Sequence, residues 1–165
     1  MKVLLIDDKV DELKRAMVAA RTAGWSYDFC NTSLRSENHP GQHGKTLRMG
    51  GASDWIEMMD GVDGVVTDLM WNHSDHGEKP MGLLVVIHAL SKGKPVVVCT
   101  NCGEYANGGH NEAVNFILAG YLNESGPDHS FDVVRDKNWK SAMECLSYRM
   151  KRKKASSKVR KTKRQ

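Results

Sequence analysis

Short apolar runs alternate along the chain with segments whose apolar residues recur at helical spacing. Four of the runs are continuous, as in strands that helices cover on both faces of a parallel sheet. These runs are Val3–Ile6, Gly64–Thr67, Val96–Cys99 and Phe131–Val134. A weaker run, Ser26–Cys30, fits a strand at the edge of the sheet.

Helical patterns fall between the runs and predict helices over residues 9–23, 53–59, 80–90 and 110–121, with a last helix starting at Trp139. The apolar stripe of the first helix consists of Val10, Leu13, Met17 and Ala20, and that of the last of Trp139, Met143, Leu146 and Met150. Gly24 ends the first helix, and Ser53 is a candidate N-cap of the second. Because strands and helices alternate, the expected fold is α/β, a doubly wound five-stranded parallel sheet with helices on both faces.

The connections differ in length according to their direction. Those from helix to strand are short, whereas those from strand to helix are long at residues 32–52, 70–79 and 101–109. In a parallel sheet the long connections all leave the carboxyl edge, where such folds bind ligands. We therefore expect a rim or lid there, although long polar loops are also found as simple insertions.

Charge divides the chain of 165 residues into two parts. Residues 151–165 hold nine Lys or Arg and no acid, and the other 15 basic and 20 acidic residues give residues 1–150 a net charge of −5. We expect one acidic globular domain over residues 1–150 and a basic, flexible tail over 151–165. The tail has the charge to contact nucleic acid, an acidic protein or anionic lipid, or simply to act as a solubilising end.

Composition favours a reduced, cytoplasmic protein. The longest apolar stretch, Leu83–Ile87, is far shorter than the roughly 20 residues that span a bilayer, so no membrane span is expected. Two aspartates follow the first four apolar residues, which argues against a signal peptide. The four cysteines are unevenly spaced, unlike those of a small disulfide-rich domain.

Polar residues of particular types stand at the ends of four predicted strands. Asp7 and Asp8 follow the first strand, Asp68 follows the run 64–67, Thr100 ends the run 96–99, and Lys137 follows the last run. Each acid alone fits an ordinary helix cap. Together, three carboxylates at one sheet edge repel one another unless a cation neutralises them, and oxygen ligands favour a hard ion such as Mg²⁺.

This set resembles the active site of a response-regulator receiver domain, which has the five-stranded fold of the bacterial chemotaxis response regulator. The phrases that carry the resemblance are LLIDD, GVVTDLM, PMGLLVV, VVVCTN and VVRDK, and they cover residues 1–150. The resemblance implies a two-component or phosphorelay function without enzymatic activity apart from self-phosphorylation and dephosphorylation. Its implied partners are a sensor histidine kinase or phosphotransfer protein and a downstream protein that reads a conformational shift.

The resemblance also implies a role for each site residue. Asp68 would be the phosphoacceptor, with Thr100 and Lys137 bonding to the phosphoryl group. Asp8 and Asp68 would bind Mg²⁺, with Asp7 binding directly or through water. Met70, two residues after the acceptor, would contribute its backbone carbonyl.

Three positions depart from the receiver pattern. Val134 stands where receivers carry Tyr or Phe, Asn138 where proline usually follows the lysine, and Asn101 where a small residue follows the threonine. Val134 and Asn138 favour an alternative, a phosphorylation-independent interaction module whose long loops form the binding surface, whereas the complete acidic set opposes it. A third reading is an aspartate-based phosphohydrolase, but such enzymes commonly place a second Asp where Met70 stands.

Weaker signals have simpler explanations. Residues 41–46, GQHGKT, match only part of a phosphate-binding loop. Cys99 and Cys102 form a C-x-x-C, for which core packing of Cys99 is the simpler explanation. His73, His76 and His110 offer metal ligands or a pH-sensitive cover, but solvated loop histidines are more common. His88 is expected to be packed in a helix, and Trp71 to shield the loop after Asp68.

Overall fold

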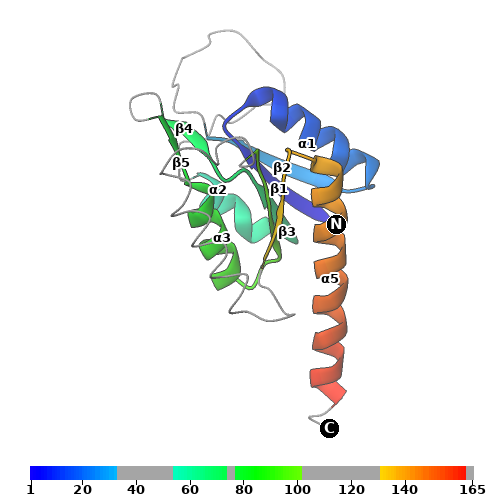
Figure 1. Cartoon of the computed structure of the whole chain (residues 1–165). Helices are drawn as coiled ribbons and strands as arrows, with labels where there is room; N and C mark the ends of the chain where they lie inside the picture. The colour runs from blue at the N-terminus through cyan, green and yellow to red at the C-terminus, as the bar shows by residue number, and fades with distance from the viewer. Residues whose placement is uncertain (33–53, 74–76, 102–130, 163–165) are drawn as a thin grey trace.

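The computed structural model describes residues 1–32, 54–73, 77–101 and 131–162. In this part of the chain, five parallel strands form one sheet in the order β2-β1-β3-β6-β7 (Figure 1). The strands are β1 (Lys2–Asp7), β2 (Ser26–Asn31), β3 (Gly64–Thr67), β6 (Val96–Cys99) and β7 (Phe131–Val134). The predicted fold class is confirmed, and each predicted strand is found to within one residue at either end.

Burial explains the pattern of the runs. The residues of β3 and β6 are completely buried, whereas the first four residues of β2, at the sheet edge, are partly exposed. Only a strand covered on both faces needs a continuous apolar run. The weaker run 26–30 therefore fits the edge position that was predicted for it.

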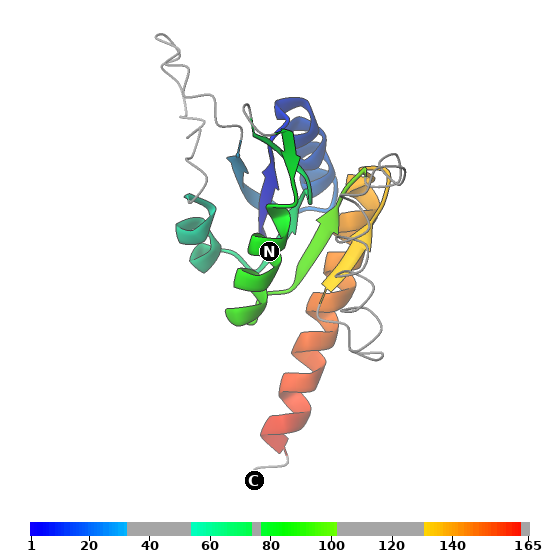
Figure 2. The same ribbon diagram turned by 60° about the vertical axis from the view of Figure 1, so that its left-hand side comes forward.

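Helices cover the two faces of the sheet. On one face lie α1 (Val10–Thr22) and α5 (Trp139–Thr162); on the other lie α2 (Asp54–Met58), the 3₁₀ turn η1 (Met59–Gly61) and α3 (Gly82–Ser91) (Figures 1 and 2). Alternate residues of β1 join different clusters, because successive strand side chains point to opposite faces. Leu4 and Ile6 pack with the α2–α3 layer, and Val3 and Leu5 with the α1–α5 layer.

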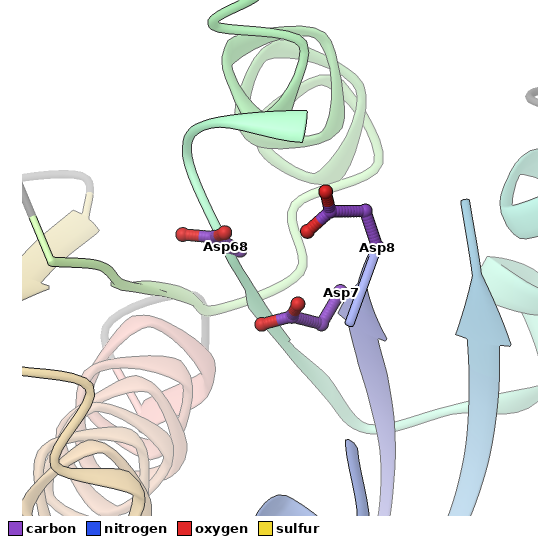
Figure 3. Close-up of side chains that lie close together, drawn as sticks. All are labelled: Asp7, Asp8 and Asp68. Carbon is purple, nitrogen blue, oxygen red and sulfur yellow. The ribbon is translucent and has the colours of Figure 1, made fainter. Parts of the chain in front are cut away.

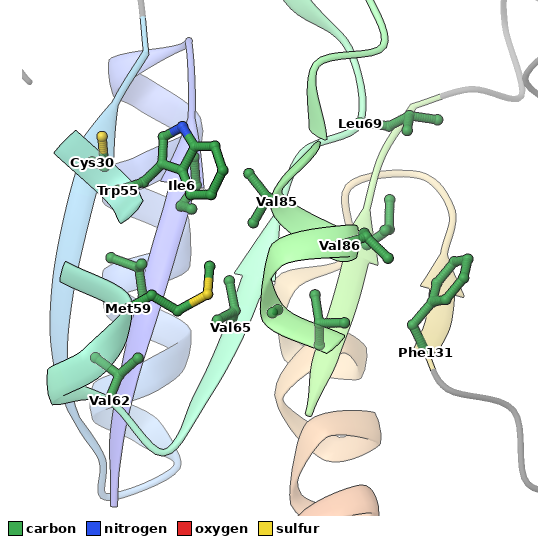
Figure 4. Packing of buried hydrophobic residues seen from close by; sticks show 14 of the residues in the cluster. Ile6, Cys30, Trp55, Met59, Val62, Val65, Leu69, Val85, Val86 and Phe131 are labelled. Carbon is green, nitrogen blue, oxygen red and sulfur yellow. The ribbon is translucent and has the colours of Figure 1, made fainter. Parts of the chain in front are cut away.

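Large side chains fill the layer between α2, α3 and the sheet. Trp55 and Met59 lie over β1 and β3, while Val85 and Val86 of α3 cover β3 and β6 (Figure 4). On the opposite face, α5 buries the predicted stripe: Trp139, Met143, Leu146 and Met150. These contacts fix the strands whose carboxyl ends carry the acidic residues.

The last helix continues beyond the globular part. We expected the domain to end at residue 150, but the backbone of α5 stays helical to Thr162. Both views show the end of α5 extending past the sheet (Figures 1 and 2). The division into a domain and a functionally separate tail stays a prediction.

Two expectations from the sequence are corrected. Residues 70–79 were expected to form a loop, but they contain an antiparallel hairpin of β4 (Trp71–His73) and β5 (Gly77–Lys79). Val10 was placed on the buried stripe of α1, yet it is 47% exposed because it is the first residue of the helix and lies beyond the packed layer.

Several other predictions lie outside the described residues. The helix over 110–121, the N-cap Ser53 and most of the loops 32–52 and 101–109 lie outside the described residues. Gly24 ends α1 as predicted, with the positive φ of 73° that a glycine adopts without strain. Among the described residues, no helix combines the length and the apolar composition that a membrane crossing needs.

Candidate functional site

Strand pairing brings the acidic residues together. β1 and β3 are parallel neighbours with Ile6 opposite Thr67, so the acidic residues at the carboxyl end of each strand lie at the same edge. The N–H of Asp68 donates to the carbonyl of Ile6 at 2.8 Å and holds the two strand ends together. Asp7, Asp8 and Asp68 are buried, and each offers a carboxylate oxygen within 4.8 Å of the others (Figure 3).

Lys137 reaches this cluster from the loop between β7 and α5. The N–H of Lys137 donates to the carbonyl of Thr100 at 3.4 Å. Asp136 and Lys137 adopt positive φ angles of 60° and 45°, which turn the chain back over the edge of the sheet. The Nζ atom of Lys137 lies 2.5 Å from Oδ2 of Asp7 and 2.7 Å from Oδ2 of Asp68. One buried ammonium thus bridges two buried carboxylates.

The charges of the cluster do not balance. Burial and the neighbouring charge of Asp68 raise the pKa of Asp7 to about 8, and Lys137 offsets only part of this rise. Burial also raises the pKa of Asp68, against the opposing effect of Lys137. Burial disfavours the charged form of Lys137, but the two carboxylates outweigh it and raise the pKa of this ammonium. Three carboxylates facing one ammonium leave an excess of negative charge.

The donor set fits a hard divalent cation. Its side-chain ligands are all carboxylate oxygens, which suit Mg²⁺ and not the softer metals that nitrogen and sulfur ligands select. Two oxygens are already oriented by the backbone: Oδ1 of Asp7 accepts from the N–H of Lys9 at 2.8 Å, and Oδ1 of Asp68 from that of Leu69 at 2.7 Å. A cation here would supply the positive charge that Lys137 alone does not.

The main chain around Asp68 is tightly enclosed. Its carbonyl accepts hydrogen bonds from the Thr67 hydroxyl at 2.8 Å and from the indole N–H of Trp71 at 3.2 Å. Trp71 is 1% exposed, so it covers this turn as expected. Gly82, the first residue of α3, donates its N–H to the carbonyl of Leu69 at 3.0 Å and lies directly against Asp68.

Replacing Gly82 with Ala should distort the acceptor turn. A Cβ atom at position 82 would lie 2.0 Å from the backbone oxygen of Asp68, and backbone cannot move aside as a flexible side chain can. We expect a loss of about 1–3 kcal/mol in the free energy of unfolding. Urea denaturation measures this loss, with Gly61→Ala as the matched control because its Cβ would meet nothing within 4 Å. Equal stability of the two variants would contradict the close approach.

Two other predicted site residues, Thr100 and Met70, lie at the same edge of the sheet. Thr100 follows β6, is 1% exposed, and bonds to the end of β7: its N–H donates to the carbonyl of Val134 at 2.9 Å. Met70 lies two residues after Asp68, and its side chain packs against the core. The roles of the Thr100 hydroxyl and the Met70 carbonyl stay predictions.

The departures from the receiver pattern have local structural consequences. Asn138 caps α5, because its side-chain oxygen accepts a hydrogen bond from the N–H of Ser141 at 3.1 Å. Val134 packs against the α1–α5 layer, and Asn101 is half-buried next to Thr100. An asparagine thus starts the helix where receivers usually carry proline.

Sequence reasoning missed the link between the site and the helical layer. The Lys137 ammonium lies 5.9 Å from the ring centre of Trp139, and the indole N–H of Trp139 donates to Glu12 of α1 at 3.0 Å. Helical spacing assigned Trp139 to the core, which is correct but incomplete. The close approach of Gly82 to Asp68 was also missed; the available signal was a glycine near the start of the helix predicted over residues 80–90.

The weaker motifs gain no support from the structure. Cys99 is buried, as expected for core packing, and burial raises the pKa of its thiol. His88 is half-buried, as expected, with its ring 5.6 Å from that of Trp55. His73 lies in β4. Residues 41–46, Cys102, His76 and His110 lie outside the described residues.

Several solved structures with similar folds are receiver proteins. A response regulator receiver protein from Sinorhizobium medicae WSM419 matches with a TM-score of 0.56 and 16% identity, covering 92% of this chain and 94% of that one. A response regulator receiver domain protein from Clostridium thermocellum gives 0.55 and 18%, covering 93% and 97%. A receiver domain protein described as CheY-like, from Methanospirillum hungatei JF-1, gives 0.55 and 11%, covering 94% and 97%.

Comparison by sequence alone finds no match. No protein-family model matches the chain, and no curated protein matches it significantly. At identities this low, structural likeness establishes the fold and leaves the function to be argued from the site. The chain therefore has the flavodoxin-like fold of response-regulator receiver domains.

Proposed function

We propose that this chain is a phosphoacceptor receiver domain of a two-component or phosphorelay system, phosphorylated on Asp68 with the help of Mg²⁺. The observation that carries the proposal is the cluster of three buried carboxylates within 4.8 Å of one another, two of them bridged by Lys137. Burying so much negative charge costs stability, so a purely structural role for all three acids is a poor explanation.

Asp68 is the proposed nucleophile. A carboxylate oxygen of Asp68 forms a bond to phosphorus while the bond from phosphorus to the donor breaks, and the donor's leaving atom takes that electron pair. Mg²⁺, held by Asp8 and Asp68 with Asp7 and the Met70 carbonyl nearby, would neutralise charge on the transferring group. Lys137 is already 2.7 Å from Asp68 and would remain paired with the new phosphoryl oxygens.

The conformational output would start from Thr100 and Lys137. Phosphoryl oxygens on Asp68 would attract the hydroxyl of Thr100 and the ammonium of Lys137, changing the ion pair between Lys137 and Asp7. Since Lys137 lies over Trp139 at the start of α5, a shift of this lysine would reach β7 and α5. A downstream protein would read the change, and a sensor histidine kinase or phosphotransfer protein would donate the phosphoryl group.

The chain would act as a signalling domain whose only chemistry is its own phosphorylation and dephosphorylation. The receiver function is assigned to residues 1–150, in the cytoplasm, where two-component phosphotransfer takes place. The phosphohydrolase reading is disfavoured because Met70 stands where such enzymes commonly carry a second Asp. Turnover of a phosphate ester would separate that reading from the receiver.

Intact mass after incubation with acetyl phosphate tests the proposal. With Mg²⁺ present, we expect a gain of one phosphoryl group per chain, because acetyl phosphate is a small donor that needs no kinase. With EDTA in place of Mg²⁺, we expect no gain, since the uncompensated carboxylates repel an anionic donor. Equal uptake with and without metal would contradict the proposed role of the acidic cluster.

A second candidate function is a phosphorylation-independent interaction module. Val134 favours it, because a smaller apolar side chain, partly buried against the α1–α5 layer, stands where receivers use an aromatic residue with the threonine. Binding of a partner that is unchanged by acetyl phosphate and by Asp68→Asn would support this function over the first.

A further inference from the structure

The charge at the end of α5 is not explained by the proposed receiver function. We call the last twelve residues of α5, residues 151–162, the basic extension; they contain seven Lys or Arg and no acid. These twelve residues add about 18 Å of helix beyond Met150 at 1.5 Å per residue. Like charges three and four residues apart destabilise a helix, and a polyanionic partner would relieve that repulsion.

The basic extension projects from the domain at the edge of the sheet opposite the acidic site. α5 begins beside Lys137 at the carboxyl edge of the sheet and runs back along it to the opposite edge (Figures 1 and 2). There the ammonium of Lys153 donates to the carbonyl of Gly93, in the turn that precedes β6. A polyanion bound to the extension would therefore lie away from Asp7, Asp8 and Asp68.

The distribution of charge around the helix distinguishes between polyanions. At 3.6 residues per turn, Lys151, Arg152 and Lys154 fall on three sides of the helix axis, while Lys153, on the remaining side, is held at Gly93. A helix that lies on a membrane needs an apolar face opposite its charged face, but the extension offers only Ala155 and Val159 as apolar residues. Cations on three sides match a groove with phosphates along both walls.

We propose that the basic extension binds the phosphate backbone of duplex DNA. The major groove of B-form DNA is wide enough to admit an α-helix, and phosphates line both of its edges. Aromatic residues for base stacking are absent from the sequence of the extension, so binding depends on charge and has little sequence preference. This inference is independent of phosphorylation at Asp68.

Fluorescence anisotropy of a labelled 25-base-pair duplex, titrated with the full chain, tests the proposal. Each neutralised phosphate contributes a slope of about −0.9 to a plot of log K against log salt concentration. With about six contacts, the affinity should fall about 10³-fold between 50 and 200 mM salt. No binding to the duplex at 50 mM salt, or an affinity that stays the same between 50 and 200 mM salt, would overturn the proposal.

Matched charge variants locate the binding. The triple variant Lys158→Gln, Arg160→Gln, Lys161→Gln should make the slope shallower by about 2.7, since three cations are lost. The control Lys14→Gln, Arg15→Gln, Arg21→Gln removes three exposed cations from α1 and should leave the slope unchanged. Equal effects of the two variants would overturn the assignment to the extension. Binding to phosphatidylserine vesicles without binding to the duplex would also overturn it.

Discussion

Replacing Asp68 with Asn should abolish phosphoryl uptake from acetyl phosphate, because an amide lacks the anionic oxygen that attacks phosphorus. Asp7 and Asp8 remain in this variant, so a loss of uptake identifies the acceptor and not only the charge of the cluster. Intact mass of the wild type and the variant, each with Mg²⁺, measures the effect. The control Asp11→Asn changes an acid of α1 whose side chain is 88% exposed, and it should take up phosphate as the wild type does.

Loss of folding would not explain a negative result for Asp68→Asn. Burial raises the pKa of Asp68, so the charged form is unfavourable in the folded state, and Lys137 keeps Asp7 as a partner when the charge at position 68 is removed. We therefore expect the variant to remain folded, which circular dichroism verifies. Uptake that persists in Asp68→Asn would contradict the assignment and direct the search to Asp7 or Asp8.

The sequence predicts the sheet well because a strand that is buried on both faces consists of a short apolar run. The runs of β3 and β6 carry no charged residue because helices cover both faces. The acids at the ends of β1 and β3 meet because these strands are parallel neighbours. The positions of Asp7, Asp8 and Asp68 therefore follow from the strand order alone. Their roles do not follow from it, because the same residue types also cap helices.

Other features depend on contacts that periodicity does not reveal. The hairpin of β4 and β5 contains only three residues per strand, too few for an alternating pattern to stand out. The close approach of Gly82 to Asp68 depends on how α3 packs at the end of β3. The continuation of α5 to Thr162 was missed because its apolar stripe stops at Met150, while the charged residues that follow are good helix formers.

The structure suggests why Lys137 tolerates its unusual surroundings. It is 8% exposed, and its ammonium is held by two carboxylates and lies over the ring of Trp139. Asn138 starts α5 directly after it through a capping hydrogen bond. A change of charge at Asp68 would therefore reach the first turn of α5 through Lys137, which contacts both Asp68 and Trp139.

The acidic cluster should make the metal-free protein less stable as the pH rises. The pKa of Asp7 is raised from 3.8 to about 8 in the folded state. Between these values the folded chain keeps a proton that the unfolded chain has released, so the free energy of unfolding falls as the pH increases. Urea denaturation in EDTA should show that Asp7 contributes about 2–4 kcal/mol of lost stability between pH 5 and pH 8.

The variant Asp7→Asn isolates this contribution, because every other titrating group is common to both proteins. We expect a smaller loss of stability between pH 5 and pH 8 in the variant than in the wild type. Parallel pH profiles of the two proteins would contradict the raised pKa of Asp7.

Mg²⁺ should raise the free energy of unfolding of the wild type at pH 8, because the cation replaces the bound proton as the source of positive charge. At ten times the dissociation constant of the ion, the gain is about 1.4 kcal/mol. The gain should be smaller in Asp8→Asn, which lacks one proposed ligand, and unchanged in Asp11→Asn. Since acetyl phosphate is absent from this experiment, it separates the two parts of the proposal: stabilisation without phosphoryl uptake would indicate a metal site alone. A wild type that gains nothing from Mg²⁺ at pH 8 would show that Lys137 suffices to hold the three carboxylates.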